Sequence, residues 1–199
     1  ISKQKKPIIL STGMSDFQEI KKIKLMLEKY HKNKITILHC VSEYPAKIKN
    51  VNLNILDELK RRFKCDIGYS DHTNEEETCI SAVAKGATII EKHVTLSKTM
   101  SGPDHKSSFT IKEFETLVEK IRKVERLLGK NQKRFSKEEK HIQFAAKKSC
   151  VSNKDLKKNH ILKKQDICFK RPGTGISPLE LNKILGKRII RDIKKNKVI

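Results

Sequence analysis

The sequence predicts an α/β fold: a parallel sheet in its first two thirds, followed by a small β-rich region. Short apolar runs alternate with amphipathic segments in four successive repeats, at intervals of about 20 to 30 residues. Each apolar run ends in polar residues, and the alternation stops after Gly129. Because strands that alternate with helices in this way form βαβ units, neighbouring strands are expected to run parallel.

The first repeat begins with a short apolar run and the second with a β-branched one. The first strand is expected at residues 7–10, and Ser15 or Asp16 can cap the amphipathic helix that follows. The second strand is expected at residues 35–40, where β-branched residues are frequent. Leucines at helical spacing then predict a helix at residues 53–63.

The third and fourth repeats follow the same plan. A strand is expected at residues 65–69 and a helix at about residues 75–85. The fourth strand, at residues 87–90, is entered through Gly86. After a loop, a long amphipathic helix is expected at residues 111–128, which completes the fourth unit.

Two architectures fit four parallel βα units: half of a (β/α)8 barrel and part of an open doubly wound sheet. Polar residues follow every strand, which suits a barrel whose βα loops build one site together, whereas an open sheet concentrates them at a switch point. We therefore favour a half barrel over residues 1–129. A charged linker, with a short helix near its end, is expected at residues 130–146, and a small β-rich domain at residues 147–199.

The composition is strongly basic. Lys and Arg total 45 against 23 acidic residues, which gives a formal net charge of +22. A nucleic-acid-binding protein is one interpretation, but the basic residues are spread over the polar faces of the expected helices, and no zinc-finger, helix-turn-helix or RNA-recognition signature is present. We therefore expect no specific nucleic-acid partner, and the charge is expected to favour an anionic substrate.

The cysteine pattern indicates a reducing compartment, and the hydropathy predicts no membrane-spanning segment. Five cysteines form no C-x-x-C pair, so neither a disulfide framework nor a zinc knuckle is predicted. No signal peptide or apolar run of spanning length is present. A cytoplasmic protein that does not bind membranes is the expectation.

Two histidines follow neighbouring strands and are candidate metal ligands. His72 and His93 could converge on one ion, and Asp71, Glu91 and Asp104 are the acids available to it. Two imidazoles with a carboxylate and open water positions suit a divalent transition ion that acts as a Lewis acid. The alternative is that these histidines only cap loops or satisfy local hydrogen bonds.

Hydroxyl groups at successive strand ends are candidate anion ligands. Ser11, Thr12, Ser42 and Ser70 follow or end the first three strands, where they could hold a phosphate or carboxylate with nearby backbone N–H groups. Ordinary turn and cap hydrogen bonds are the alternative role of such residues. Arg171, directly before a Pro-Gly turn in the small domain, could present its guanidinium to an anion, or be one more surface cation.

A set of motifs runs in one order through nearly the whole chain. They are STGM at 11–14, LHC at 38–40 with YP at 44–45, GYSDHT at 68–73, EKH at 91–93, GPDH at 102–105 and KRPGTGI at 170–176. In sequence, order and spacing this set resembles the sialic acid synthases, the N-acetylneuraminate synthase family. The resemblance implies that the half barrel is the C-terminal half of a TIM barrel, and that the β-rich domain is an antifreeze-like SAF domain of the β-clip type.

The resemblance also implies a reaction. Members of this family condense phosphoenolpyruvate with an N-acylated hexosamine, typically N-acetylmannosamine, to a nine-carbon keto acid with release of phosphate, a transferase reaction of the EC 2.5.1 class. They use Mn²⁺, Mg²⁺ or another divalent ion, which His72 and His93 would hold and Glu91 would support. The same matching implies substrate-binding roles for Ser11, Thr12, Ser42, Tyr44, Ser70, Asp104 and Arg171.

Partners and alternatives follow from the same resemblance. The SAF domain implies a domain-swapped homodimer, in which Arg171 enters the partner subunit's site. Because family barrels begin about a hundred residues further upstream, in line with an ordinary barrel of about 250 residues, we expect this chain to be incomplete and not to catalyse alone. A legionaminate or pseudaminate synthase, an inactive fragment and a basic nucleic-acid-binding protein are the alternatives.

Overall fold

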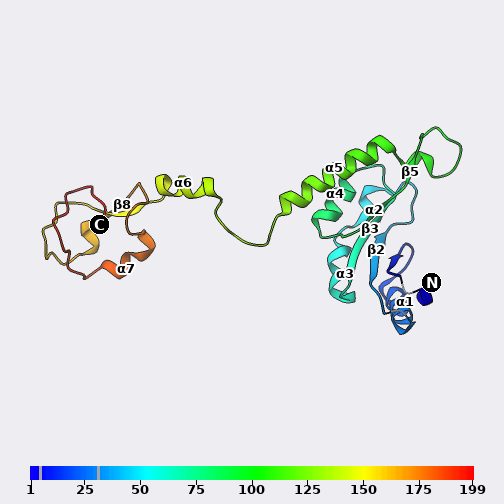
Figure 1. Cartoon of the computed structure of the whole chain (residues 1–199), viewed down its shortest axis with the longest axis horizontal. Coiled ribbons are helices and arrows are strands. Elements are labelled where there is room, and N and C mark those ends of the chain that lie inside the picture. Colours follow the sequence, from blue (N-terminus) through cyan, green and yellow to red (C-terminus); the bar gives the residue numbers. More distant parts are fainter. Residues whose placement is uncertain (5, 31) are drawn as a thin grey trace. The chain divides into compact units, whose positions relative to one another are not determined.

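The computed structural model describes residues 1–4, 6–30 and 32–199. The chain forms two compact units, Ile1–Lys130 and Asn131–Ile199, here called unit 1 and unit 2 (Figure 1). Each unit is considered by itself.

Unit 1 is built on a parallel sheet of four strands in the order β1-β2-β3-β4. The strands are β1 (Ile8–Ser11), β2 (Ile35–Cys40), β3 (Asp66–Asp71) and β4 (Ile90–Lys92). Neighbours in the sheet are also neighbours in the chain, and every pair is parallel. Such an order has no point at which the strand sequence reverses, so it lacks the switch point of an open doubly wound sheet. The predicted α/β fold with a parallel half-barrel is therefore confirmed.

The fourth strand lies later than predicted. Regular pairing with β3 begins at Ile90 and extends to Lys92, two residues beyond the expected end. Before it, the Thr88 N–H donates to the Ile67 carbonyl (2.8 Å), and the Ile89 carbonyl accepts from the Tyr69 N–H (2.9 Å). The change from apolar to charged residues was a poor marker of the strand end, because the charged side chains continue the alternation between the two faces of the sheet.

Five α-helices accompany the sheet in the part of unit 1 that the structure describes. Asp16 rather than Ser15 caps the first of them, since its carboxylate accepts hydrogen bonds from the N–H groups of Gln18 (2.7 Å) and Glu19 (2.8 Å). A short helix at Ile48–Val51 was not predicted. The helices are α1 (Phe17–Tyr30), α2 (Ile48–Val51), α3 (Ile55–Phe63), α4 (Glu77–Ala84) and α5 (Ile111–Leu128).

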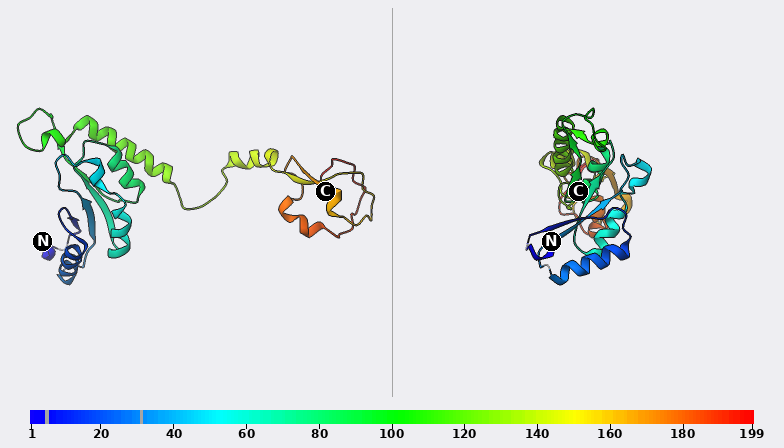
Figure 2. Two further views of the ribbon diagram at one scale, coloured as in Figure 1. Left: turned by 180° about the vertical axis from the view of Figure 1, so that it is seen from behind. Right: turned by 90° about the vertical axis from the view of Figure 1, so that its right-hand side faces the viewer.

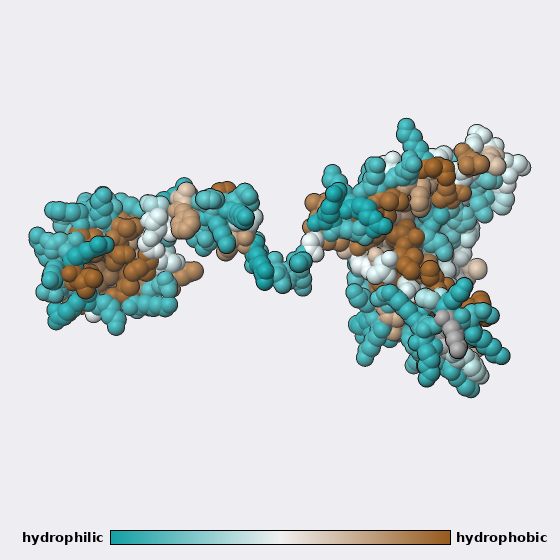
Figure 3. Space-filling view, in the orientation of Figure 1, coloured by the Kyte–Doolittle hydropathy of each residue, from teal (hydrophilic) through white to brown (hydrophobic). Residues whose placement is uncertain are grey.

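The main core lies between the sheet and these helices. Helices α3, α4 and α5 lie on one side of the strands in opposite views of the molecule (Figures 1 and 2). Hydrophobic residues gather along the strands of unit 1, with hydrophilic residues around them (Figure 3). Complete burial of a Val, Leu or Ile side chain contributes roughly 1.5–3 kcal/mol to the free energy of unfolding. The core residues are Ile20, Ile37, Val51, Leu56, Leu59, Ile67, Tyr69, Ala82 and Ala87.

Beyond β4 the chain forms a loop closed by two very short strands. Strand β5 (Val94–Thr95) pairs in parallel with β6 (Phe109–Thr110), so the loop between them leaves and returns at one place. Inside this closure, the Thr95 hydroxyl lies 2.7 Å from Nδ1 of His105. The loop carries the GPDH motif and is thus held at both ends. Neither strand was predicted, since two residues are too short for a periodic pattern.

Unit 2 contains less regular β-structure than predicted. Helix α6 (Lys137–Ala146) precedes the antiparallel strands β7 (Ser149–Ser152) and β8 (Ile167–Lys170), and a one-turn helix, α7 (Leu181–Ile184), follows them. Among the described residues, the remaining β-pairing consists of three isolated bridges. The other segments are joined by short groups of backbone hydrogen bonds between loops, such as the reciprocal pair between Leu156 and Ile193 (2.8 and 2.9 Å), which a search for alternating strands does not find.

A buried carboxylate organises the loops of unit 2. Asp166 is fully buried and lies 2.8 Å from the ammonium of Lys154, 2.7 Å from Nε2 of His160 and 2.9 Å from the backbone N–H of Lys163. Burial alone raises the pKa of Asp166, but these donors outweigh it and hold the pKa well below its usual value. Ionised Asp166 therefore connects three segments of this small unit.

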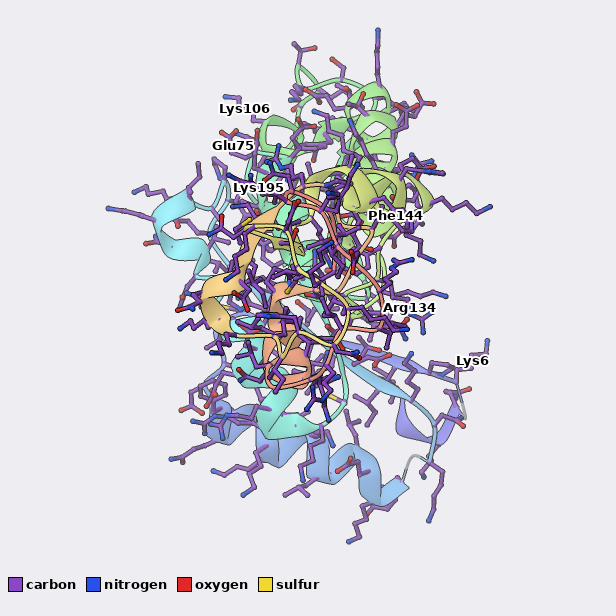
Figure 4. All side chains as sticks on the ribbon, turned by 90° about the vertical axis from the view of Figure 1, so that its left-hand side faces the viewer. Lys6, Glu75, Lys106, Arg134, Phe144 and Lys195 are labelled. Atoms are coloured by element: carbon purple, nitrogen blue, oxygen red, sulfur yellow. The ribbon has the colours of Figure 1, made fainter. Side chains whose placement is uncertain are left out.

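Basic residues occur on different parts of unit 1. Lys6 and Lys106 project from well-separated parts of that unit (Figure 4), and both are exposed. No helix of the described residues is both long enough and apolar enough to span a membrane.

Candidate metal and substrate site

The carboxyl ends of β2, β3 and β4 place polar side chains on the face of the sheet that the helices leave uncovered. Cys40 pairs with Ser70, and Ser70 pairs with Glu91, so these three side chains form one row across the sheet. The Ser70 hydroxyl donates to Oε1 of Glu91 over 2.7 Å. His72 and His93 come two residues later in the chain, and the alternation of side chains directs them to the same side as this row.

The two histidines meet at this end of the sheet. Their ring centroids lie 5.2 Å apart, with an angle of 68° between the ring planes. Nδ1 of His72 lies 2.8 Å from the Val41 carbonyl oxygen, which can only accept a hydrogen bond. Nδ1 therefore carries the proton, and Nε2 keeps its lone pair free for a ligand. His72 is buried, whereas His93 exposes about a third of its side chain (35%).

Tyr44 covers the pair of histidines. Its ring centroid lies 4.1 Å from that of His72 and 5.8 Å from that of His93, where the contact is edge-on. The segment that carries Tyr44 is tied to the site, because the Ala46 N–H donates to the His72 carbonyl over 2.9 Å. Partial burial raises the pKa of Tyr44, and the negative charges nearby add to this effect. The side chain is thus a neutral phenol at physiological pH, half exposed toward the open side of the site (52%).

Asp104 approaches the site from the loop between β5 and β6. Its carboxylate Oδ2 lies 3.9 Å from Nδ1 of His93. In the described part of the chain, no three or more His, Cys, Asp and Glu side chains gather as a metal-binding group. The arrangement still fits an ion held by two protein ligands, because His72 offers a lone pair and His93 stands beside it. The positions left open would take water or substrate oxygen atoms.

The serine side chains lie on the same open face, and Thr12 does not. Ser11 pairs with Leu38, which lies two residues before Cys40, so alternation directs Ser11 and Cys40 to one face. The Thr12 hydroxyl instead donates to the Leu38 carbonyl over 2.7 Å in a buried position. This bond fixes the end of β1 against β2.

Ser42 depends on a glycine. A Cβ atom at Gly13 would overlap with Oγ of Ser42 and come within 3.2 Å of Sγ of Cys40. The missing side chain at Gly13 therefore makes the space that Ser42 occupies. Ser42 itself is exposed at the end of β2.

Arg171 belongs to unit 2 and is exposed directly before the predicted Pro-Gly turn. Ser149 holds this turn from β7: its hydroxyl donates to the Pro172 carbonyl over 2.7 Å and accepts from the Gly175 N–H over 2.9 Å. The guanidinium therefore extends from a chain segment that two hydrogen bonds define.

Asp71 does not join the histidines, so the interpretation of it as an available acid for the ion is wrong. It lies on the helix side of the sheet, where Tyr69, Thr73, Thr78 and Cys79 donate hydrogen bonds to it. The alternation of side chains along β3 could have indicated this, since Asp71 stands between Ser70 and His72.

Lys92 was not singled out from the sequence, although its side chain is completely buried and lies 2.6 Å from Asp71. Burial alone raises the pKa of Asp71, but the ammonium of Lys92 outweighs it and holds the pKa below its ordinary value. The two residues form an ion pair behind the site.

Comparison with known proteins gives a family match in each of the two units. A model of the NeuB family matches residues 1–133, and a model of the SAF domain matches residues 147–199. The chain is 42% identical over 201 residues to the N,N'-diacetyllegionaminic acid synthase of Campylobacter jejuni, covering 100% of this chain and 60% of that protein. It is 39% identical over 190 residues to the synthase of the same name from Legionella pneumophila, covering 94% of this chain and 53% of that protein.

A solved structure is also similar. The N-acetylneuraminic acid (sialic acid) synthetase of Leptospira borgpetersenii, in complex with citrate, aligns with a TM-score of 0.66 and 34% identity, over 71% of this chain and 49% of that one. The chain thus spans between about half and three fifths of the length of these relatives. With the family model covering all of unit 1, the chain belongs to the NeuB family of sialic acid synthases and carries an SAF domain at residues 147–199.

Proposed function

We propose that the chain provides the metal-binding side of the active site of a sialic-acid-type synthase, which condenses phosphoenolpyruvate with an N-acylated hexosamine. In this reaction C3 of phosphoenolpyruvate bonds to the aldehyde carbon of the sugar, water adds at C2, and phosphate leaves. The observation that supports the proposal best is the approach of the His72 and His93 rings to 5.2 Å beside the Ser70–Glu91 pair, in a chain of this family.

The histidines would hold Mn²⁺ or another divalent ion such as Mg²⁺, with Glu91 in a supporting position. When bound, such an ion supplies Lewis-acid activation of the sugar aldehyde. His72 presents its Nε2 lone pair because the Val41 carbonyl fixes the proton on Nδ1. The Tyr44 ring covers His72 and limits the access of water from that side.

The hydroxyl groups on the open face would bind phosphoenolpyruvate. Ser11, Ser42 and Ser70 come from the ends of three adjacent parallel strands, and each can donate one hydrogen bond to a phosphate or carboxylate oxygen. The Ser70 hydroxyl donates to Glu91, so substrate binding would exchange this partner. Thr12 would contribute indirectly, by holding the end of β1 beside Ser11, since its hydroxyl and its backbone N–H both donate to the Leu38 carbonyl.

Tyr44 and Asp104 would contact the sugar at the exposed side of the histidines. Two sugars are candidates. The sequence motifs led us to expect N-acetylmannosamine, whereas the names of the Campylobacter and Legionella relatives favour a 2,4-diacetamido hexose, the substrate type of a legionaminate synthase. A phenol ring and a carboxylate can bind the hydroxyl and acetamido groups of either sugar.

The complete enzyme is proposed to be a cytoplasmic, domain-swapped homodimer with a closed (β/α)8 barrel. The sequential, parallel strand order of unit 1 is the order that such a barrel requires. Arg171 would bind the substrate of the partner subunit from the turn that Ser149 holds. A guanidinium suits the phosphate and carboxylate of phosphoenolpyruvate because it donates two parallel hydrogen bonds.

The proposal is tested with the complete gene product, by phosphate release from phosphoenolpyruvate with Mn²⁺. N-acetylmannosamine and the 2,4-diacetamido hexose are compared, and the His72→Ala and His93→Ala variants are measured with the better sugar. His141→Ala is the matched control, because His141 is exposed on α6 in unit 2. We expect release with one sugar, retained in the control and lost in both site variants. If the folded, metal-loaded protein releases no phosphate with either sugar, the proposal fails.

A further inference from the structure

An ion pair lies directly behind the two histidines. Lys92 precedes His93 in the chain, and Asp71 precedes His72, and the two charged residues are register partners across β3 and β4. Their side chains are both completely buried and 2.6 Å apart. Because side chains alternate along a strand, this pair occupies the helix side of the same strand ends whose other side presents the histidines.

Lys92 also contacts the residues before and after His72 and a residue that is hydrogen-bonded to His93. Its ammonium binds the Asp71 carboxylate before His72 and the Thr73 carbonyl after it. The same ammonium lies 4.1 Å above the ring of Phe109, whose backbone N–H donates to the His93 carbonyl over 2.9 Å. One cation thus joins the backbone around His72 to the strand that precedes His93.

Stability alone is a weak explanation for such a pair. Two charges taken out of water lose hydration that their mutual attraction only partly restores, and well-packed apolar residues often replace a buried pair without loss of stability. What apolar residues cannot replace is direction, because Asp71 accepts from Lys92, from the Tyr69 hydroxyl and from the Thr73 N–H at fixed angles.

We infer that Asp71 and Lys92 are positioning residues: their buried ion pair fixes the ends of β3 and β4 so that His72 and His93 hold the spacing needed to share one divalent ion. This inference rests on the proposed function for the identity of the ligand. The pair touches neither the ion nor the substrate, and it acts through the backbone of the two histidines.

The test is the double variant Asp71→Asn/Lys92→Met, which removes both charges and keeps similar volumes. Its matched control is Asp66→Asn/Lys34→Met, the same exchanges in an exposed ion pair at the opposite end of β3. Mn²⁺ affinity is measured in the complete gene product by electron paramagnetic resonance of the free ion, at a temperature at which circular dichroism shows all proteins folded. We expect a 10- to 100-fold weaker affinity in the site variant, the range found for residues that orient metal ligands, and less than a twofold change in the control.

A second measurement separates this inference from the proposed function. Nitrogen-15 resonances of the histidine rings report whether His72 keeps its proton on Nδ1, as the bond to Val41 requires. We expect one tautomer in the wild type and a mixture in the site variant. If the wild type fails to bind Mn²⁺, the proposed function fails, and the tautomers alone decide the positioning role. A site variant with wild-type tautomer and wild-type affinity overturns the inference, and if the double variant does not fold, Asp71→Asn is measured in its place.

Discussion

Gly68, in the middle of β3, has no room for a side chain. A Cβ atom there would overlap with Cδ2 of Leu38 and lie 2.5 Å from the Ile89 carbonyl oxygen. The first of these contacts is with a side chain, but the second is with the backbone of the segment leading into β4. Because ordinary contacts of this kind begin at 3.4 Å, Gly68→Ala would require the two backbones to separate by about 0.9 Å.

The separation of the two backbones determines how much stability Gly68→Ala costs. Overpacking of a core costs typically 1–3 kcal/mol, and two simultaneous overlaps, one with backbone, place Gly68→Ala at about 3 kcal/mol. For a protein of 150–250 residues such a loss lowers the melting temperature by roughly 6–12 °C. Since Ser70 and Glu91 lie two residues further along the same strands, we also expect their hydrogen bond to lengthen.

The assay is thermal unfolding followed by circular dichroism, with Gly86→Ala as the control. Gly86 has a φ of +94°, and no atom lies closer than 3.9 Å to the position that a Cβ would take there. Alanine at this position therefore causes backbone strain without overlap, at a cost of about 1–2 kcal/mol. Gly68 should be the more sensitive of the two positions. A melting temperature of Gly68→Ala within 2 °C of the wild type would refute this reasoning.

Three further changes test other parts of the structure. Lys92→Met leaves the buried Asp71 carboxylate without its cation, so we expect a loss of about 3–5 kcal/mol in urea denaturation, most of it recovered when Asp71→Asn is added. Asp166 has a lowered pKa, so its ionised form contributes stability to unit 2 that is complete above about pH 5 and lost as the pH falls toward the folded-state pKa. Asp166→Asn should therefore weaken the pH dependence of the urea midpoint between about pH 2 and 5. Gly13→Ala should displace Ser42 and raise the KM for phosphoenolpyruvate about tenfold, the equivalent of one hydrogen bond, with Mn²⁺ affinity unchanged.

The periodic part of unit 1 could be predicted from the sequence. Helix α5 begins and ends at the expected residues, and β2 does so as well, because both have an uninterrupted apolar pattern. The predictions were poorer where the pattern is short. Strands β5 and β6 have two residues each, and the loops of unit 2 are joined by isolated bridges between residues far apart in the chain. Such contacts depend on tertiary structure that a local pattern does not contain.

The candidate site shows the same limit for single residues. His72 and His93 were identified as a pair from their positions after neighbouring strands, and the structure brings their rings together. Lys92 was overlooked because lysine is common on this basic chain and a buried lysine is rare. Only the position of its partner across the sheet distinguishes it from the exposed lysines, and that partner is set by the register of β3 and β4.

The alternation at the ends of β3 and β4 has a consequence for mutational scanning of this chain. Conservative substitutions at Ser70, His72 and Glu91 should leave the amount of protein in the cell nearly normal and abolish its product, because these side chains lie outside the hydrophobic core between the sheet and the helices. Substitutions at Asp71 and Lys92 should instead lower the amount of protein. A scan that measures both quantities would therefore show, at alternate residues along these two strands, a loss of product with normal abundance and a loss of abundance. This pattern would report which face of the sheet each residue occupies.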